Sequence, residues 1–576
     1  MIPNNALTES ARLFVATLAA SGVTDVVVSP GSRSTPLVVA LVREARIRCH
    51  SIIDERSAAF FALGQARIHE RPSAVLCTSG TALVHYLPAL VEASLTGLPL
   101  VVVSADRPHE LQHCHAPQTI DQVKVFGEYV RAEFDVPAAD GTTSSLVGVR
   151  RMVAQAVASS MDPRPGPVHI NFRARKPLEP RAPGTPEELE LVSRVDALLA
   201  RRLPVPGRSM RFASSTSIEA ANAEIEASRR GIIVCGPALP SRIAHATAIA
   251  ALSRRTGFPV YTEATSQLRY GPWPADVPRI AHLDLLVRKL SADTLPDLVI
   301  QVGLPPTFEL LPKLESMGPA PSVVVLSEDD FCDPSGLATT IVFGDIGESC
   351  RRLSRTSPSV SPYAALDEVA RCVVRSELQK VPFAEGQAVR ALVDSLGSGD
   401  TLVVGNSLAV RALDTYTDVG TSDIRVVSQR GASGIDGNVA LAAGVSDAQG
   451  GRTTLLCGDV TLLHDIGSFI QAKAFVKDLR IVVVNNGGGR IFEQLPIVAV
   501  PDLESKVLDL TLTPHTTEFA LAAAAAGSSY VRVTDEKALR EALAEAPSGL
   551  RLIEVVVEAS GAIAQSRRLW EALGGP

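Results

Sequence analysis

The chain has 576 residues, too many for one ordinary hydrophobic core, so its length alone predicts three or four domains. Hydrophobic residues make up 46% and charged residues 20%, a balance typical of a well-buried globular protein and not of a disordered one. The formal net charge of -7 is modest and no dense run of Lys and Arg occurs. This argues against nucleic acid or an anionic membrane as a partner.

The first residues and the apolar runs argue against export and against a membrane span. Residues 1–14 (MIPNNALTESARLF) carry no basic stretch followed by an apolar core, so we expect no secretory signal. The longest apolar runs, such as residues 98–103, have the length of a strand and not of a bilayer span. The eight cysteines stand without a CxxC pair, which argues against a zinc site or a disulfide framework and predicts a cytoplasmic location.

Short apolar, β-branched runs alternate with helix-length amphipathic stretches along most of the chain, which is the pattern of parallel sheets covered by helices. In the first third we expect helices over residues 8–21 and 81–96, and a domain exit in the Pro-, Arg- and Glu-rich stretch 176–188. The strands predicted in this third are 26–29, 74–78, 100–104 and 168–172.

The rest of the chain repeats this pattern, with a second linker predicted over residues 354–360 (SRTSPSV). The predicted strands are 231–235, 298–302, 322–326, 402–404, 424–427, 454–457, 481–484 and 552–556. We find no short-period repeat. We therefore predict an α/β fold with three doubly wound parallel-sheet domains, over residues 1–182, 183–360 and 361–576.

The strongest chemical signal lies in the last third. One predicted strand ends in Gly458-Asp459, and the next ends in Asn486 before a glycine-rich turn (GGGRIF), so polar groups follow two strands where open α/β sheets bind ligands. Asp459, the Asn486 side chain and a turn carbonyl such as that of Gly488 are oxygen ligands that suit Mg²⁺. Each piece alone is better explained as a helix cap or as a turn than as a metal site.

A second candidate lies near the N-terminus, where Glu55 follows a strand-like run and precedes a helix of small residues (SAAFFALGQA). A lone Glu after an apolar pair is usually a solvated helix residue. At the junction of a strand and a helix it can instead point into an interdomain cleft.

Together these two segments resemble the thiamine-diphosphate enzymes, whose motif begins with GDG and ends with NN; Val460 replaces the last Gly of GDG. The resemblance implies that Asp459, Asn486 and Gly488 bind Mg²⁺ or Mn²⁺, which holds the diphosphate. It also implies that Glu55 hydrogen-bonds N1′ of the aminopyrimidine and favours the tautomer that takes the C2 proton. In that superfamily the Glu and the diphosphate site come from different subunits, which implies a homodimer or a dimer of dimers.

Eight ordered stretches are more specific and are similar to the MenD family, the 2-succinyl-5-enolpyruvyl-6-hydroxy-3-cyclohexene-1-carboxylate synthases. They are SPGSRSTPL (29–37), IDERSAAFFALG (53–64), TSGTA (78–82), SADRPHEL (104–111), GPVHINF (166–172), GNSLAVR (405–411), QRGASGIDG (429–437) and NNGGGRIF (485–492). The resemblance implies a transferase of menaquinone biosynthesis that decarboxylates 2-oxoglutarate and adds the succinyl carbanion equivalent to isochorismate. It also implies that the three predicted domains are a pyrimidine-binding, a central and a diphosphate-binding domain.

The same resemblance implies roles for individual residues, several of them arginines, whose planar fork can bind both oxygens of a carboxylate. Catalytic roles are implied for Glu55, Ser32, Arg33 and Gln118. Substrate binding is implied for Ser32, Arg33, Arg107, Gln118, Ser407, Arg411 and Arg430, with Ser407 and Arg411 on one helix face. Cofactor binding is implied for Glu55, Ile435, Gly458, Asp459, Val460, Asn486, Gly488, Ile491 and Phe492. The ordinary alternatives are surface ion pairs for the arginines and core packing for Ile435, Ile491 and Phe492.

The middle third departs most from the family. Glu309, in LPPTFELL, stands where the family has a cation, so either Lys313 or Arg288 takes its place or carboxylate binding differs. The HxH pair His113 and His115 has metal-ligand spacing but no third ligand nearby, so we expect loop residues there. Two other functions stay open: a thiamine-dependent carboligase or 2-oxo acid decarboxylase with another acceptor, and a non-catalytic regulatory or scaffold paralogue.

Overall fold

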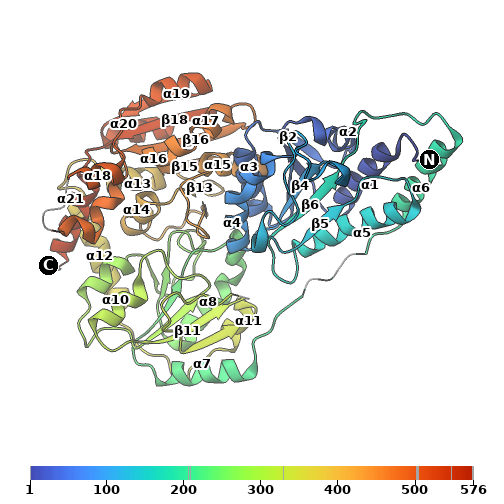
Figure 1. Cartoon of the computed structure of the whole chain (residues 1–576). Coiled ribbons are helices and arrows are strands. Elements are labelled where there is room, and N and C mark those ends of the chain that lie inside the picture. The colour runs from blue at the N-terminus through green and yellow to red at the C-terminus, as the bar shows by residue number, and fades with distance from the viewer. Residues whose placement is uncertain are drawn as a thin grey trace. The chain divides into compact units, whose positions relative to one another are not determined.

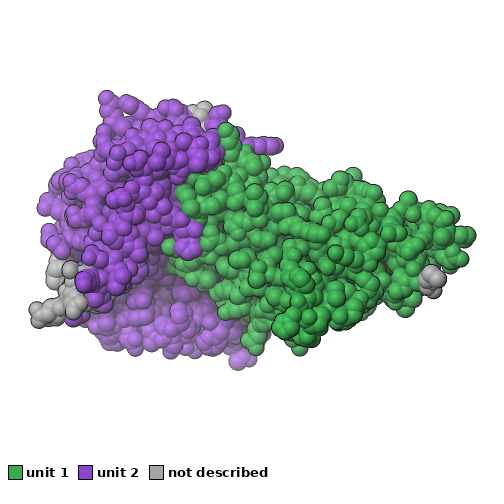
Figure 2. All heavy atoms as spheres, turned by 45° about the horizontal axis from the view of Figure 1, so that its top comes forward, with its two compact units in different colours: residues 1–209, 429–450, 465–476 green, residues 210–428, 451–464, 477–576 purple. Residues whose placement is uncertain are grey.

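The chain forms two compact units (Figure 2), and each is described by itself. The computed structural model describes residues 2–204, 207, 209–328, 330–500, 505–545 and 548–573. Unit 1 contains residues 1–209, 429–450 and 465–476, and unit 2 contains residues 210–428, 451–464 and 477–576. In the described residues the strands form three six-stranded sheets with every strand pair parallel (Figure 1), which confirms the predicted α/β class.

The first sheet lies in unit 1, and its strands follow in the order β2-β1-β3-β4-β6-β5. They are β1 (Asp25–Val28), β2 (Arg48–Ser51), β3 (Ser73–Cys77), β4 (Leu100–Asp106), β5 (Glu133–Val136) and β6 (Pro167–Arg173). The helices of this part of the chain are α1 (Ala6–Ala20), α2 (Thr35–Arg43), α3 (Glu55–His69), α4 (Leu87–Thr96), α5 (Thr143–Ser159) and α6 (Pro186–Ala200). The interior strands β3, β4 and β6 are buried along their whole length, as strands covered by helices on both faces must be.

The middle sheet lies in unit 2, in the order β12-β11-β10-β7-β8-β9. Its strands are β7 (Gly231–Cys235), β8 (Val260–Thr262), β9 (Arg279–Ile280), β10 (Leu298–Val302), β11 (Ser322–Ser327) and β12 (Thr340–Phe343). The accompanying helices are α7 (Ser215–Ala227), α8 (Ala246–Thr256), α9 (Leu283–Leu286), α10 (Leu310–Met317) and α11 (Ile346–Arg352).

The third sheet also lies in unit 2, in the order β14-β13-β15-β16-β18-β17. Its strands are β13 (Thr401–Val404), β14 (Arg425–Ser428), β15 (Thr453–Gly458), β16 (Asp478–Asn485), β17 (Ser529–Val533) and β18 (Gly549–Val556). Its helices in unit 2 are α12 (Tyr363–Leu378), α13 (Glu385–Asp394), α14 (Leu408–Tyr416), α16 (Asp459–His464), α18 (Ser505–Leu512), α19 (Phe519–Ala526), α20 (Glu536–Ala544) and α21 (Gly561–Ala572). Two further helices, α15 (Asn438–Ala448) and α17 (Ile466–Ala472), belong to unit 1.

The first and third sheets have the same strand order. When strands are numbered from the first strand of each sheet, both read 2-1-3-4-6-5, whereas the middle sheet reads 3-2-1-4-5-6 from its other edge. In the order 2-1-3-4-6-5 the connections run in opposite directions from strands 1 and 3. The switch points are therefore β1/β3 in the first sheet and β13/β15 in the third, and ligands bind at such points in open α/β sheets.

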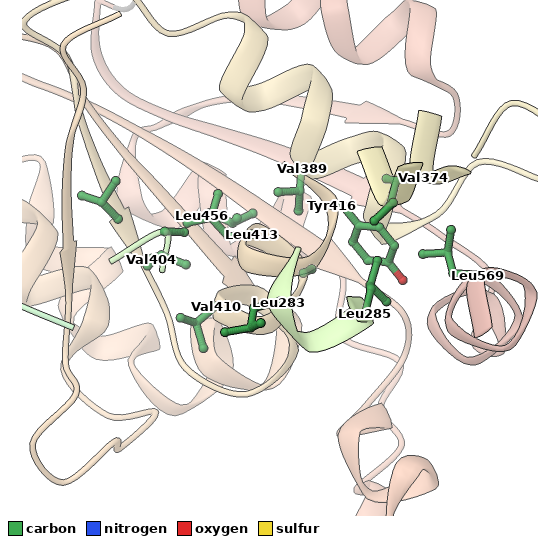
Figure 3. Close-up of a cluster of buried hydrophobic side chains, with 14 of the residues drawn as sticks. Leu283, Leu285, Val374, Val389, Val404, Val410, Leu413, Tyr416, Leu456 and Leu569 are labelled. Carbon is green, nitrogen blue, oxygen red and sulfur yellow. The ribbon is translucent and has the colours of Figure 1, made fainter. Parts of the chain in front are cut away.

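The largest apolar cluster of unit 2 surrounds α14 (Figure 3). Val410, Leu413 and Tyr416 of this helix point into the cluster, at the three-residue spacing of a buried helix face. Leu283 and Leu285 of α9 and Leu456 of β15 belong to the same cluster, so one core joins the middle and third sheets. This packing leaves Arg411 exposed on the other face of α14.

All predicted strands are confirmed, and their ends agree with the structure to within two residues. The exceptions are β16 and β18, which begin three residues earlier than predicted. The helix predicted over residues 81–96 is wrong in its first part: residues 81–86 form a 3-10 helix, η2 (Thr81–Tyr86), and α4 begins at Leu87. Pro88, in the first turn of α4, has no N–H to continue a helix that began earlier. None of the helices in the described ranges is long and apolar enough to cross a membrane. Each sheet lies within one of the predicted ranges 1–182, 183–360 and 361–576, whose limits stay a prediction.

Candidate active site

In unit 1, Ser32 and Arg33 lie on a 3-10 turn that follows β1, at the switch point of the first sheet. Gly31 allows the close approach, because a Cβ atom there would lie 2.2 Å from the Cβ of Thr78 at the end of β3. The Arg33 main-chain N–H donates to Thr78 Oγ1 at 3.3 Å, and the guanidinium donates to the carbonyl of Ala174 at 2.8 Å. The turn thus presents an exposed hydroxyl and a buried, firmly held cation.

Arg107 and Gln118 reach the same switch point from the chain that follows β4. The Arg107 guanidinium donates to the hydroxyl of Ser79 and, at 2.5 Å, to the main-chain carbonyl of Gln118. The Gln118 side-chain amide donates to the carbonyl of Ser79 at 3.0 Å. Gly80 has φ of +90°, and a Cβ atom there would lie 2.9 Å from Gln118 Cγ, so only glycine permits this contact.

The two guanidinium groups of this cluster lie close enough to repel each other. Burial lowers the pKa of Arg33, and the positive charge of Arg107 lowers it further. Asp106 opposes this effect, but its carboxylate is already paired with Arg173 at 3.0 Å. An anionic ligand would relieve the repulsion, so the cluster of Ser32, Arg33, Arg107 and Gln118 has the charge that a carboxylate requires.

Glu55 is the first residue of α3 and is half-buried. Asp54 caps the helix, because its carboxylate accepts the Arg56 N–H at 3.2 Å and the Ser57 hydroxyl at 2.6 Å. Burial raises the pKa of the Tyr86 hydroxyl, and the charge of Glu55 adds to this rise, so the Glu55 carboxylate lies near the end of η2.

Helix α3 is held in unit 1 by α15 and α17. A Cβ atom at Gly64 of α3 would lie 2.3 Å from the carbonyl oxygen of Leu441 of α15, so the two helix backbones nearly touch. The fully buried Asp465 accepts the N–H of Val439 at 2.8 Å and lies 3.5 Å from the guanidinium of Arg56. These contacts fix the end of α3 that carries Glu55.

Residues 429–437 of unit 1 carry two further predicted site residues, Arg430 and Ile435, and both are half-buried. The Gln429 side-chain amide donates to the carbonyl of Asp436 at 3.0 Å and closes this segment into a loop. Arg430 therefore lies next to one anchored end of the loop and Ile435 next to the other.

In unit 2, Ser407 and Arg411 lie at the start of α14, at the switch point of the third sheet. Ser407 is the N-cap residue and has φ of +65°, a conformation that non-glycine residues rarely adopt. The Arg411 guanidinium donates to the Ser407 carbonyl at 2.9 Å, so the two residues are in contact one helical turn apart.

Asp459 follows β15 at the same switch point and is 2% exposed. Its Oδ2 accepts the N–H groups of Gly487 at 2.8 Å and Gly488 at 2.9 Å, so the carboxylate organises the glycine-rich turn after β16. Its Oδ1 accepts the N–H of Val460 at 2.7 Å. The Val460 position thus contributes its main chain, which valine provides as well as glycine does.

Asn486 lies beside Asp459 in a buried environment. Its side-chain N–H donates to Glu385 at 3.0 Å, which fixes the amide orientation, and its Oδ1 is buried with no hydrogen-bond partner among the described residues. Burial raises the pKa of Glu385, and the nearby charge of Asp459 adds to the rise. A buried, unsatisfied oxygen next to two carboxyl groups is a site that fits a hard cation such as Mg²⁺.

Gly488 requires glycine, because its φ is +143° and a Cβ atom would lie 2.5 Å from the carbonyl oxygen of Leu512. Ile491 and Phe492 follow on a 3-10 helix, η7 (Arg490–Gln494). Phe492 is 38% exposed, so ordinary core packing does not explain it.

A cavity of about 680 Å³ in unit 2 is lined by Arg411 together with Arg288, Lys313, Glu309 and Glu385. The Arg288 guanidinium is held by stacking, 4.1 Å from the ring centroid of a tryptophan in α21. Burial lowers the pKa of Lys313, and the positive charge of Arg288 lowers it further. Neither Arg288 nor Lys313 is held in a salt bridge within the described residues, so the cavity contains cations available to an anionic ligand.

One group of three metal-ligand side chains occurs in the described ranges: Asp25, His50 and Asp447. Arg48 pairs with Asp25 at 2.7 Å and with Asp447 at 2.6 Å, so both carboxylates of this group already take part in an ion-pair network. The HxH loop noted in the sequence is not part of it.

The sequence prediction missed Glu385, which orients Asn486. Glu385 is an acidic residue in the first turn of a helix, which is where acidic residues ordinarily occur. The sequence around it therefore does not indicate the contact with Asn486.

Comparisons with known proteins give matches in the first and the last part of the chain. Residues 8–125 match the thiamine pyrophosphate enzyme, N-terminal TPP binding domain, and residues 418–555 match the corresponding C-terminal TPP binding domain. The 2-succinyl-5-enolpyruvyl-6-hydroxy-3-cyclohexene-1-carboxylate synthase of Sorangium cellulosum (strain So ce56) is 40% identical, over 97% of this chain and 94% of that protein. Proteins of the same name are 37% identical in Myxococcus xanthus (strain DK1622), over 97% of this chain and 96% of the relative, and 33% identical in Oceanobacillus iheyensis, over 98% of both. The chain therefore belongs to the family of 2-succinyl-5-enolpyruvyl-6-hydroxy-3-cyclohexene-1-carboxylate synthases.

Proposed function

We propose that the protein is a transferase that uses thiamine diphosphate and Mg²⁺ to decarboxylate 2-oxoglutarate and to add the succinyl group to isochorismate. The product is 2-succinyl-5-enolpyruvyl-6-hydroxy-3-cyclohexene-1-carboxylate, an intermediate of menaquinone biosynthesis. Relatives with this name that align with 97% of the chain support the proposal. The structural observation that carries it is the grouping of Arg33, Arg107 and Gln118 at one switch point, because both substrates are polycarboxylates.

Asp459, Asn486 and the main-chain carbonyl of Gly488 would hold Mg²⁺, or Mn²⁺ in its place. The unsatisfied Asn486 Oδ1 supports this assignment, since magnesium takes oxygen ligands and fills its octahedron with phosphate and water. Gly458 and Val460 flank Asp459 and would approach the diphosphate through their main chains. When bound, thiamine diphosphate supplies the carbanion chemistry that cleaves and forms the carbon–carbon bonds.

The other residues would control protons and orientation. The Glu55 carboxylate would accept a hydrogen bond from the cofactor's aminopyrimidine and hold its protonation state. The polar residues predicted from the sequence would bind and orient the carboxylates of the substrates. They are Ser32, Arg33, Arg107, Gln118, Ser407, Arg411 and Arg430. Ile435, Ile491 and Phe492 would supply apolar contacts to the cofactor and keep water from it.

We also propose that Arg288 and Lys313 together replace the missing cation at Glu309. They line the same cavity as Arg411. Burial and the positive charge of Arg288 lower the pKa of Lys313, and the Asp284 carboxylate of the same cavity opposes this effect. Stacking on an aromatic ring holds the Arg288 guanidinium in place without using its N–H groups, which stay available to a carboxylate.

Replacing Lys313 or Arg288 with glutamine is expected to raise KM for one of the two substrates by roughly ten- to a hundred-fold, the effect of losing a charge-assisted hydrogen bond. Steady-state kinetics with each substrate varied in turn measures this effect and identifies the carboxylate concerned. The exposed Lys289→Gln is the matched control, because that residue adjoins Arg288 but does not line the cavity. Unchanged KM values for both substrates in both variants would rule out the replacement.

The overall activity is tested by incubating the purified protein with thiamine diphosphate, Mg²⁺, 2-oxoglutarate and isochorismate. The expected result is loss of isochorismate with stoichiometric release of carbon dioxide, dependent on both cofactors. Consumption of 2-oxoglutarate with another acceptor only would indicate a different carboligase. No turnover under any of these conditions would indicate a non-catalytic relative.

We further propose that the protein works in the cytoplasm as a homodimer or a dimer of dimers. All eight cysteines are free, which fits a reducing compartment. Sedimentation velocity across a concentration series measures the assembly, and a monomer at all concentrations would contradict it.

A further inference from the structure

Glu92 is a buried carboxylate that none of the assigned roles explains. It lies in α4 of unit 1 and is 1% exposed. Its Oε1 accepts from the Arg67 guanidinium at 3.2 Å and from the Gly431 N–H at 3.1 Å. Its Oε2 accepts from the same Gly431 N–H at 3.1 Å and from the Ala432 N–H at 2.7 Å. One carboxylate therefore binds two consecutive main-chain N–H groups of the loop 429–437.

The contact also depends on glycine. A Cβ atom at Gly431 would lie 2.9 Å from Leu95 Cβ, 2.9 Å from Thr96 Cγ2 and 3.0 Å from Glu92 Oε2. Any other residue would push the loop away from α4 and lengthen the hydrogen bonds to Glu92. The loop main chain thus packs closely against α4, in addition to donating its N–H groups to the Glu92 carboxylate.

The loop is fixed at its other end as well. Gly437 has φ of +63°, and a Cβ atom there would lie 2.0 Å from the Phe60 ring of α3. Between these two anchors lie Arg430, directly before the bound N–H groups, and Ile435, two residues before Gly437. The direction of the Arg430 side chain therefore depends on the bonds that Glu92 makes to its neighbours.

We propose that Glu92 is a positioning residue: by binding the N–H groups of Gly431 and Ala432 it sets the place of Arg430 and Ile435 for their ligands. The inference rests on the proposed function for the roles of Arg430 and Ile435, and extends it to a residue that touches neither substrate nor cofactor. A simple stabilising ion pair between Glu92 and Arg67 is the competing explanation. That explanation gives no part to the loop.

Hydrogen exchange tests the loop contact without any substrate. In Glu92→Gln, amide exchange in peptides covering residues 429–437 is expected to rise by about ten- to a hundred-fold, because two N–H groups lose an ionised acceptor. Gly431→Ala changes the loop and not α4, and it should produce the same rise in exchange while the ion pair between Arg67 and Glu92 stays intact. Exchange equal to that of the native protein in both variants would overturn the inference.

Kinetics then tests the positioning role. The Glu92→Gln enzyme is expected to show a KM for a carboxylate substrate raised by about ten-fold, with a smaller change in kcat. In an Arg430→Ala background the same substitution should change KM by less than about three-fold, because the group that it positions is already gone. Equal KM effects in the two backgrounds would overturn the inference. A native protein without synthase activity would instead overturn the proposed function, and the exchange result would still decide the loop contact.

Arg67→Gln is the control for the ion pair. It removes the guanidinium and leaves both main-chain N–H groups bound to Glu92. Its melting temperature is expected to fall, while exchange in residues 429–437 and KM stay near the native values. If Arg67→Gln reproduced the full pattern of Glu92→Gln, the ion pair alone would explain both and the positioning role would be rejected.

Discussion

The Glu55→Gln enzyme is expected to lose about 10²- to 10⁴-fold in kcat, the range for removal of a positioned acid–base group. An amide cannot carry the negative charge that stabilises the protonated aminopyrimidine in the proposed mechanism. The fold should remain, because Glu55 is the half-buried first residue of α3 and its loss removes a helix-dipole interaction of about 0.3–1 kcal/mol. Initial rates of isochorismate loss, together with thermal unfolding, measure the two effects.

Glu70→Gln provides the control for this substitution. Glu70 lies at the other end of α3 and is also half-buried, so the chemical change and the helix are the same. Its kcat should stay near that of the native enzyme. Native activity in Glu55→Gln would remove Glu55 from the mechanism, and an equal loss in Glu70→Gln would point to damage of the helix.

Asp459→Asn is expected to cause the second-largest loss, through the cofactor and not through the chemical step. The substitution removes the charge of a predicted metal ligand and weakens the hydrogen bonds from Gly487 and Gly488, each worth about 1.5–3 kcal/mol when the acceptor is ionised. Affinity for thiamine diphosphate with Mg²⁺ should fall by at least about a hundred-fold. The rise in melting temperature that the cofactor produces in the native protein should then be small or absent at the same concentration.

Asp478→Asn is the matched control. Asp478 lies at the opposite end of β16 and its carboxylate also accepts a glycine N–H, that of Gly549 at 2.9 Å. Its response to the cofactor should equal that of the native protein. Chelation with EDTA should abolish cofactor binding in the native protein, and added Mg²⁺ or Mn²⁺ should restore it. Cofactor binding by Asp459→Asn with native affinity would contradict the metal assignment.

Most interior strands could be predicted from the sequence, whereas the three-residue interior strand β8 and several edge strands could not. β3, β4 and β15 are buried nearly throughout, so their sequences are continuous apolar runs with a turn at the end. β2 has the polar sequence RCHS and is largely exposed at the edge of the first sheet. β9 has two residues, and β17 is an edge strand that is mostly unburied. Strands that need no apolar pattern leave no pattern to detect.

Many of the predicted site residues follow an interior strand at a switch point of its sheet. Arg33 after β1, Ser407 after β13 and Asp459 after β15 could be found because strand ends and side-chain chemistry are both visible in the sequence. Glu92 and Glu385 could not be found in this way. Each is an acidic residue of an ordinary helix, and its partner lies about a hundred residues or more further along the chain. A contact of that kind is a product of tertiary packing, and no local pattern encodes it.

The close packing of α3 against α15 has a consequence for the synthesis of the protein. Phe61 of α3 is fully buried, and the main chain of α3 at Phe61 and Gly64 contacts Gly444 and Leu441 of α15. These residues of α15 leave the ribosome only after most of the chain has been made. At about 5–20 residues per second, the apolar face of α3 waits for its partner for tens of seconds. A nascent chain in this state exposes a surface that chaperones bind. A fragment ending near residue 209 would expose the same surface permanently, so the natural unit for expression is the full chain.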